Sequence, residues 1–305
     1  MIKKLILSFF MMGFVVALFG QQQTLYTHYM FNTSTFNPAY AGTRDAISAT
    51  MTHRSQWVGF SGAPVTQSLI VHSPLVKGLG AGFSLVNDKI GPLNFTSLNV
   101  DLAYRLKLTR KSRLSFGLKS AVNISSADFS SLELNDQVQD PTFQESIQGD
   151  VSPNFGAGIY YYNETFYVGL STPYLLKNKK ATTLSTDVAQ SQQHYYLMGG
   201  AILPINRYVK FRPSVFIKTT KGAPTQFDLT GFFVFYDKIW AGTMFRSGDA
   251  IGLLAGYNIN DDIQIGYSFD WSYQILGRNS GSHELMIRYE FNVKPRKRVL
   301  SPRFF

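Results

Sequence analysis

The sequence contains no cysteine among its 305 residues, which excludes disulfides, thiolate metal sites and lipidation through a cysteine. Charged residues make up only 16% of the chain, against about 25% in an average soluble domain. Long apolar runs are also scarce, because the mean hydropathy of −0.05 is far too low for a bundle of membrane helices. What remains is one or two globular domains, or a single large all-β barrel.

Aromatic residues are abundant, with 25 Phe and 17 Tyr. Together with a hydrophobic content of 45%, this excludes a disordered chain. So many aromatics beside so few charges fit an ordinary soluble enzyme poorly.

The first twenty residues predict a secretory signal peptide. Lys3 and Lys4 precede an apolar run from Leu5 to Phe19, and Gly20 is a small residue at a suitable cleavage point. A single membrane anchor is the alternative, and it is disfavoured because the run is short and no second apolar stretch follows. Export narrows the class to a periplasmic, secreted or outer-membrane β protein.

From about residue 45 onward, apolar and polar residues alternate with a period of two. The stretches 98–108, 263–271 and 285–291 show the pattern clearly. It predicts strands of about 9–11 residues, the length that a tilted strand needs to cross a bilayer. Trp271, Tyr289 and other aromatic residues end the apolar stripes, as in the girdles of membrane barrels. A soluble sandwich also alternates, but usually with shorter strands.

Fourteen strands are predicted, an even number as single-chain bacterial barrels require. The predicted strands are 45–57, 64–73, 78–86, 94–108, 112–125, 152–162, 165–171, 194–203, 208–218, 226–236, 239–247, 250–259, 262–271 and 282–291. With the N-terminus in the periplasm, the even-numbered connections are short and the two longest, 126–151 and 172–193, are external. This alternation is typical of outer-membrane barrels. The predicted fold class is therefore all-β, a 14-stranded antiparallel transmembrane barrel.

The segment before the first strand does not alternate. In it, Asn37 is suited to cap a short helix that begins at Pro38, continues through Ala39 and ends at Gly42. The expected organisation is a signal peptide (1–20), an N-terminal plug or hatch inside the lumen (21–44), the barrel (45–291) and a basic periplasmic tail (292–305). A plain N-terminal turn is the alternative to a plug.

Several stretches carry a family resemblance. They are HYMFNTSTFNPAYAGT (28–43), RSQWVGFSGAP (54–64), GLGAGFSLVNDKIGP (78–92), PNFGAGIYYYNETFYVGLSTPYL (153–175) and SHELMIRYEF (282–291). Together they closely resemble the PorP/SprF family of type IX secretion membrane proteins over nearly the whole mature chain. The combination is specific, whereas Asn-Pro-Ala alone is a weak signal that also occurs in the hatch of long-chain fatty-acid transporters.

The resemblance implies a fatty-acid-transporter-like barrel in the outer membrane of a Gram-negative, Bacteroidetes-like bacterium. It also implies a non-enzymatic part in type IX secretion and gliding. The implied partners are outer-membrane lipid, a secreted adhesin-like cargo with a type B C-terminal domain, and periplasmic ring lipoproteins of the machine. The role is then export partner or cell-surface anchor. The same motifs suggest structural roles at the barrel rim for Arg54, Trp57, Gly62 and Pro64.

Charged residues on the polar phase of the strands predict a charged lumen. They are Arg54, Asp101, Arg105, Lys107, Lys119, Asp270, Glu284, Arg288 and Glu290. Ion pairs among them would stiffen the wall and tether a plug. A selective water-filled pore is the functional alternative.

Two segments outside the strands are charged with one sign. The connection 126–151 carries acidic residues and no basic one: Asp128, Glu133, Asp136, Asp140, Glu145 and Asp150. A plain solvated loop is one interpretation; a docking loop for a secreted partner is favoured over a calcium site, because the spacing does not match a calcium loop. The tail has only basic residues: Lys294, Arg296, Lys297, Arg298 and Arg303. Periplasmic partner binding and a plain solvated end remain open for it.

Catalysis has little support in the sequence. The five histidines form no HExxH motif or metal-spaced cluster, and neither GxSxG nor a P-loop is present. His53, His72 and His283 are expected at the rim or in a girdle. No catalytic residue, metal or cofactor is expected, and export disfavours a nucleic-acid partner despite the formal charge of +10. The rival functions are a transporter for hydrophobic small molecules and, third, a generic porin.

Overall fold

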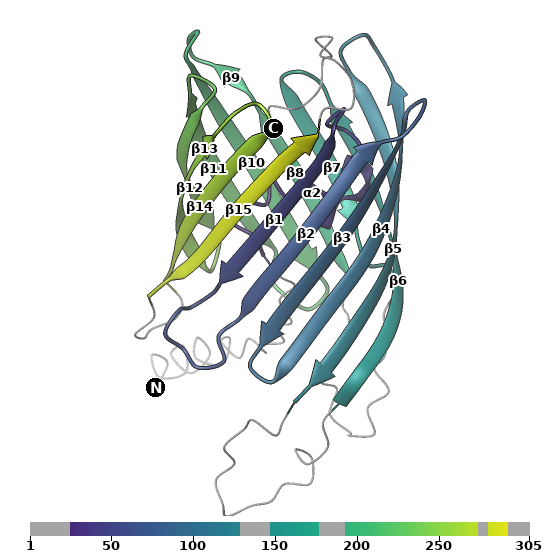
Figure 1. The fold of residues 1–305 in the computed structure, drawn as a ribbon, viewed down its shortest axis with the longest axis vertical. Helices are drawn as coiled ribbons and strands as arrows, with labels where there is room; N and C mark the ends of the chain where they lie inside the picture. The colour runs from purple at the N-terminus through teal and green to yellow at the C-terminus, as the bar shows by residue number, and fades with distance from the viewer. Residues whose placement is uncertain (1–24, 129–146, 177–192, 274–279, 292–305) are drawn as a thin grey trace, which may run out of the picture.

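The computed structural model describes residues 25–128, 147–176, 193–273 and 280–291, and within these it is a closed antiparallel β-barrel (Figure 1). Its strands are β1 (Ile47–Ser55), β2 (Val65–Pro74), β3 (Leu79–Ile90), β4 (Leu93–Lys107), β5 (Arg113–Ala127), β6 (Ile147–Tyr162), β7 (Phe166–Thr172), β8 (His194–Ala201), β9 (Leu203–Pro204), β10 (Val209–Thr220), β11 (Gln226–Phe235), β12 (Ile239–Arg246), β13 (Ala250–Asn258), β14 (Ile263–Ser272) and β15 (Ser282–Phe291). β9 continues β8 after Ile202 and pairs with the same strand, β10, so the barrel has fourteen strands.

Closure is complete because the first and last strands pair along their full length. β1 and β15 are antiparallel from Ile47↔Phe291 to Ser55↔His283. Closing a sheet in this way removes the exposed edges that an open sheet would present. The predicted fold class, an all-β fourteen-stranded antiparallel barrel, is confirmed.

The wall has the two-faced pattern that the alternation predicts. On β4, Leu98, Val100, Leu102 and Tyr104 are exposed, whereas Asn99, Asp101 and Ala103 between them are buried. The buried positions face a filled interior and the exposed apolar ones form the outer surface. This is the arrangement of a barrel in lipid, with polar groups inside.

Connections differ in length between the two ends of the barrel. At one end every connection between described strands is a short turn, including 108–112, 163–165 and 236–238. The other end carries the 56–64, 128–146 and 173–193 connections, and we take it as the external end by the loop-length rule. Two external connections are nevertheless short, 91–92 and 247–249.

Two strands, β3 and β6, are at least three residues longer than the sequence predicts. β3 runs to Ile90, because Asn87 and Asp88, poor strand formers by themselves, are held by cross-strand side-chain bonds. β6 begins at Ile147, after a register shift opposite Ser125 and Ala127. Asp150 therefore lies in strand β6 rather than in the external loop, which corrects its predicted place.

Residues 25–46 form an ordered segment inside the barrel. It contains one helical turn, α2 (Thr33–Phe36), and a 3₁₀ turn, η1 (Pro38–Tyr40), and nearly all of it is buried (Figure 1). Along its course Asn32 lies at Thr52 and Gly42 at His72, so the segment runs from the external half of the lumen towards the start of β1. We call residues 25–46 the lumen segment.

No helix among the described residues is both long enough and apolar enough to cross a membrane.

Candidate functional site

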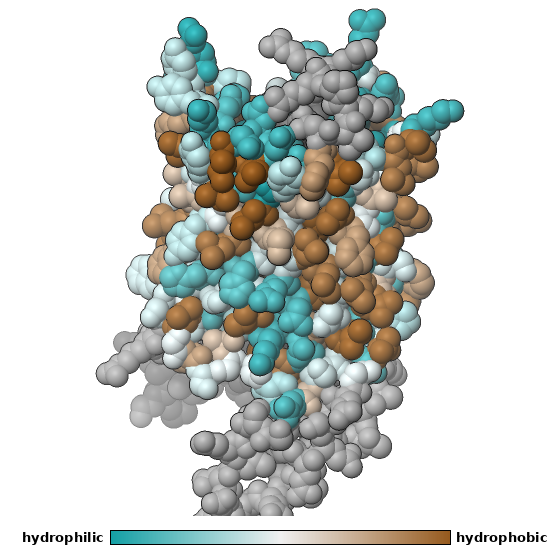
Figure 2. Space-filling model, in the orientation of Figure 1, coloured by the Kyte–Doolittle hydropathy of each residue, from teal (hydrophilic) through white to brown (hydrophobic). Residues whose placement is uncertain are grey.

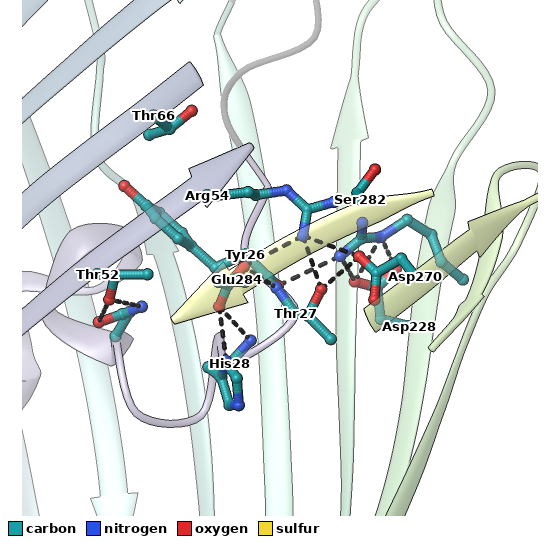
Figure 3. Close-up of polar contacts among 12 residues, drawn as sticks. Tyr26, Thr27, His28, Thr52, Arg54, Thr66, Asp228, Asp270, Ser282 and Glu284 are labelled. Atoms are coloured by element: carbon teal, nitrogen blue, oxygen red, sulfur yellow. Dashed lines mark hydrogen bonds and ion pairs between the residues drawn. The ribbon is translucent and has the colours of Figure 1, made fainter. Parts of the chain in front are cut away.

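The external half of the lumen holds a buried ionic cluster that joins the lumen segment to the wall (Figure 3). Glu284 of β15 is at its centre. Its two oxygens accept hydrogen bonds from the backbone N–H of Thr27 at 2.8 Å and of His28 at 2.9 Å. They also contact His28 Nδ1 at 2.8 Å and the guanidinium of Arg54 at 3.2 Å. A carboxylate with four such partners is fully satisfied despite its burial.

Two more carboxylates extend the cluster across the wall. Asp270 of β14 accepts from the Thr27 hydroxyl at 2.5 Å and pairs with Arg54 at 2.8 Å. Arg246 of β12 donates twice to Asp228 of β11, with Nε–Oδ2 at 3.0 Å and Nη2–Oδ2 at 2.9 Å, and once to the carbonyl of Tyr26 at 3.2 Å. Strands far apart in the sequence thus converge on three consecutive residues of the lumen segment.

This cluster acts chiefly as a specific tether. Replacing a whole buried ion network by apolar residues is often neutral, but removing one partner costs about 3–5 kcal/mol, because a buried charge is left alone. The cluster therefore fixes where the lumen segment sits rather than adding much net stability. The sequence analysis expects ion pairs among lumen charges that tether a plug, and the ion pairs of this cluster join the lumen segment to the wall.

The Asn37-Pro38-Ala39 turn is the second attachment point. The Asn37 side chain accepts from the backbone N–H of Ala39 at 2.9 Å and donates to the carbonyl of Ile159 on β6 at 3.0 Å. Its first role is the helix capping that the sequence predicts, with Pro38 at the first position of the turn. Its second role, fixing the turn to β6, has no signal in the local sequence.

Glycines on the inner face of the wall let the turn approach closely. A Cβ at Gly117 of β5 would lie 2.2 Å from the backbone nitrogen of Ala39, and one at Gly158 of β6 would lie 2.1 Å from Asn37 Oδ1. A Cβ at Gly80 of β3 would lie 2.3 Å from the carbonyl oxygen of Ala41. The missing side chains are the space in which the turn sits.

Further bonds hold the segment between these points and at its end. Lys119 of β5, paired with Asp101 at 3.3 Å, donates to the carbonyls of Ser34 at 3.2 Å and Thr35 at 3.3 Å. Arg105 donates to the carbonyl of Gly42 at 2.5 Å. These lysine and arginine side chains, predicted to face the lumen, each bind the backbone of the lumen segment.

The arginines of β15 and of the lumen segment complete the periplasmic half. Arg44 pairs with Glu290 on β15. Arg288 donates to the carbonyl of Phe31 at 2.5 Å and lies 5.0 Å from the centre of its ring. Lys107 differs from the other predicted lumen charges, because it lies exposed at the end of β4.

An aromatic cluster fills the lumen between the segment and the wall. Phe36 packs against Phe216 with ring centres 4.8 Å apart and against Tyr196 at 5.3 Å, and Tyr29 packs against Phe216 at 5.1 Å. Burial raises the pKa of the Tyr29 phenol, and likewise that of Tyr26, above the ordinary value. The interior beside these residues is a packed core.

His72 is misplaced by the sequence analysis. It is buried in the lumen, where its Nδ1 lies 3.3 Å from the backbone nitrogen of Gly42 and its ring packs on Tyr40 at 5.2 Å, so it is not a rim residue. The inward phase of β2 could have predicted this, since His72 alternates with outward Val71. His53 and His283 do point outward, as expected.

The predicted rim residues divide between two places. Arg54 points into the lumen, as part of the ionic cluster, and does not belong to the rim. Trp57, Gly62 and Pro64 lie in the external 56–64 connection. There the backbone N–H of Trp57 donates to Ser282 Oγ at 3.1 Å, and the carbonyl of Gly62 accepts from Gly91 at 2.9 Å.

The charged segments lie mostly outside the described residues. Of the six acidic residues, Asp128 and Asp150 are described, whereas Glu133, Asp136, Asp140 and Glu145 lie outside the described residues. The five basic residues of the tail lie outside them too. Asp128 follows β5, and its backbone N–H donates to the carbonyl of Pro92 at 2.9 Å.

Within the described part of the chain, no group of three or more His, Asp or Glu side chains is arranged to hold a metal ion. The clustered carboxylates each have arginine, histidine or backbone partners instead. What this arrangement does is bind and position a segment of its own chain.

Fold and site together define the class: an outer-membrane β-barrel whose lumen is occupied by its own N-terminal segment. The family described as "Type IX secretion system membrane protein PorP/SprF" matches residues 18–289. The chain belongs to this family, which is not known to be enzymatic. It is therefore a membrane protein of the type IX secretion system, placed in the outer membrane.

Solved barrels resemble the chain in fold only. The CymD monoaromatic hydrocarbon channel is similar with a TM-score of 0.54 at 9% identity, over 91% of this chain and 96% of that chain. The NanC porin has a TM-score of 0.44 at 13% identity, over 81% and 99%. The KdgM porin has a TM-score of 0.42 at 10% identity, over 80% and 99%. None of the curated proteins matches the chain.

Proposed function

We propose that this barrel is an export partner or cell-surface anchor for a secreted, adhesin-like protein of the type IX system, one carrying a type B C-terminal domain. The observation that carries the proposal is the family match over residues 18–289. The mechanism is binding: the barrel holds a partner at the surface, and its periplasmic side contacts the ring lipoproteins of the machine.

The occupied lumen supports a binding role over permeation. The lumen segment is fixed by ionic pairs in the external half, by the Asn37 turn at mid-barrel and by Arg44 with Glu290 near the start of β1. A segment fixed at three levels along the barrel axis resists displacement by a passing solute. In this proposal residues 21–44 are a resident plug, 45–291 the barrel and 1–20 a cleaved signal.

The external acidic connection and the basic tail are the proposed contact regions. Asp128 directly follows β5 and Asp150 lies in the neighbouring strand β6, so the two flank the acidic connection. The acidic residues between them give this part of the external end negative charge, which suits a partner with a basic surface. The basic tail, 292–305, suits an acidic periplasmic partner.

A deletion tests the proposal in the organism itself. Removing residues 130–146 leaves both flanking strands intact. We expect the barrel to assemble, and the large surface proteins of the type IX system to move from the cell surface into the medium or to stay in the periplasm. Deleting 221–224, in the β10–β11 connection, is the matched control. Unchanged surface proteins in a strain that lacks the whole barrel would refute the proposal.

A channel for hydrophobic small molecules is the second candidate. The aromatic residues Phe36, Tyr196 and Phe216 inside the barrel favour it, as does the fold of the hydrocarbon channel CymD. Lipid or hydrocarbon recovered in the purified barrel, with no secreted protein affected by its loss, would support this candidate over anchoring.

A further inference from the structure

The outer wall of the barrel carries polar side chains on one group of neighbouring strands. Among the outward-facing strand positions with described side chains, every amide and imidazole lies on β15, β1, β2, β3 or β4. With two hydroxyl residues beside them they form what we call the outer polar row: Tyr267, His283, His53, Gln67, Asn87, Thr96 and Asn94.

The row is continuous across the strands. His53 is directly opposite Gln67, Gln67 is opposite Asn87, and Asn87 is opposite Thr96. His283 is opposite Ser55, the next outward residue of β1 after His53. Cross-strand partners on one face lie about 5 Å apart, so these side chains are immediate neighbours.

Hydrogen bonds link neighbouring members of the row. Gln67 Nε2 and His53 Nδ1 are hydrogen-bonded at 3.4 Å, and His53 Nε2 and Ser55 Oγ at 3.2 Å. Asn87 Nδ2 donates to Asn94 Oδ1 at 2.7 Å and to Thr96 Oγ1 at 2.9 Å. The Gln67–His53 and Asn87–Thr96 bonds each join two adjacent strands across the outer face.

The row shortens the apolar surface of this side. On β5 the outward stripe from Leu114 to Ile124 is apolar except for Ser120 and spans about 26 Å along the barrel axis for strands tilted by about 40°. On β1 it runs only from Ile47 to Met51, about 10 Å by the same geometry. An outer-membrane barrel needs an apolar band about 25 Å tall. Figure 2 shows the hydrophilic patch that interrupts the hydrophobic surface on this side.

The connection just beyond the row exposes apolar side chains, the reverse of the polar side chains that the row exposes on the wall. Val58 and Phe60 follow β1 at the external end and are 37% and 44% exposed. The connection is well fixed, since the Val58 N–H donates to Gly281 at 2.8 Å and its carbonyl accepts from Ser280 at 2.8 Å. Polar groups thus lie at the depth of lipid chains, and apolar groups lie beyond them. A thinner bilayer would accommodate the first but would leave Val58 and Phe60 in water.

We propose that the outer polar row and the adjoining Val58–Phe60 surface form a lateral docking site for another outer-membrane protein. Because the row consists of amides, imidazoles and hydroxyls, with Lys89 opposite Asn94 on the same outer face, the partner's face offers hydrogen-bonding side chains at membrane depth. Because Val58 and Phe60 are apolar and exposed, the partner also offers apolar side chains just outside the membrane. This site is separate from the proposed contact with a secreted cargo and does not depend on it.

Position-specific photo-crosslinking in intact cells of the native organism tests the site. The photoreactive amino acid is placed at Gln67, in the row, or at Leu118, a control on β5 that is 68% exposed. We expect a discrete adduct from Gln67 with one outer-membrane protein other than this chain, reproduced when the probe is placed on that partner. We expect Leu118 to give no such adduct.

A variant links the adduct to the polar row. With the probe at Val58, the double change Gln67→Leu and Asn87→Leu should reduce the adduct at least about fivefold, since each hydrogen bond contributes about 1 kcal/mol. Heat-modifiable migration of the barrel on gels confirms its assembly. Adducts with lipid alone, adducts with a second copy of this chain, or an unchanged Val58 adduct in the assembled variant would overturn the proposal. If the variant does not assemble, the crosslinking from Gln67 and Leu118 in the otherwise unchanged chain decides whether the proposal stands.

Discussion

The close contact between Gly117 and the Asn37 turn gives the most direct test of how the lumen segment is held. Gly117→Ala places a Cβ 2.2 Å from the Ala39 backbone nitrogen and 2.4 Å from the Pro38 carbonyl carbon. Both are backbone atoms, so no side chain can rotate out of the way. For the Cβ to reach ordinary contact at 3.4 Å, the turn must move by more than an ångström.

Such a movement has a calculable cost. It breaks the 3.0 Å bond from Asn37 to the Ile159 carbonyl, about 1 kcal/mol. Overpacking adds about 1–3 kcal/mol. The total of about 2–4 kcal/mol would raise the population of the released lumen segment about 30-fold to 1000-fold. The matched control is Gly199→Ala on β8, whose Cβ would meet its nearest atom at an ordinary 3.4 Å.

The chain's lack of cysteine provides the assay. Ser34 is 2% exposed, and its hydroxyl has no hydrogen-bond partner in the structure, so Ser34→Cys is a mild change and the only thiol. Maleimide labelling of that thiol reports release of the segment. We expect Gly117→Ala to accelerate labelling within the stated range and Gly199→Ala to leave it unchanged. Equal rates in the two variants would refute the close-packing argument.

Three further predictions follow from the same geometry. Glu284→Gln should weaken the attachment of the lumen segment by about 3–5 kcal/mol, because Arg54 loses one of its buried partners. The control Asp237→Asn breaks only the exposed pair with Lys210 and should destabilise the barrel by at most about 1 kcal/mol. Raising the pH should release the segment only above about pH 10, because burial raises the folded pKa of Tyr26 above its unfolded value. The stabilisation is complete below that pH and is lost as the pH rises through the folded pKa, which tyrosinate absorbance would follow. Release already at pH 8 would contradict the assignment. In planar bilayers the native barrel should conduct ions poorly and a chain lacking residues 25–44 should conduct well; high conductance of the native barrel would favour a pore.

The strands were predictable because their periodicity is a local property of the sequence. The stripe from Leu98 to Leu106, for example, alternates without interruption, and the short turns at one end show which connections belong to the same side of the membrane. Predictions failed where long-range side-chain bonds extend a strand. Asn87 and Asp88 look like turn residues, and only their partners on β4 and β2 make them part of β3.

The sequence predicts which residues make up the site, but not which of them bind one another. Asn37 and Pro38 signal their own turn, and the strand phase places Arg54 and Glu284 in the lumen. That the Glu284 carboxylate binds the Thr27 and His28 backbone depends on a contact across more than 250 residues, which no local pattern encodes. The inward glycines were a signal that could have been used, since an inward glycine in a strand indicates close approach of another backbone.

The outer polar row also escapes a local reading. In sequence, His53 and Gln67 look like single polar residues on otherwise apolar phases. Only the register brings them side by side and shows that the apolar band is interrupted there.

Isolation of the barrel from its native membrane tests the central claim most directly. The protein is tagged in its own organism, the outer membrane is solubilised gently, and the proteins that remain bound are identified and quantified by mass spectrometry. An anchor or export partner predicts a large secreted protein in near-equal amount, together with or without the periplasmic ring lipoproteins. A barrel recovered without any protein of the type IX system, and with bound lipid or hydrocarbon, would contradict that claim.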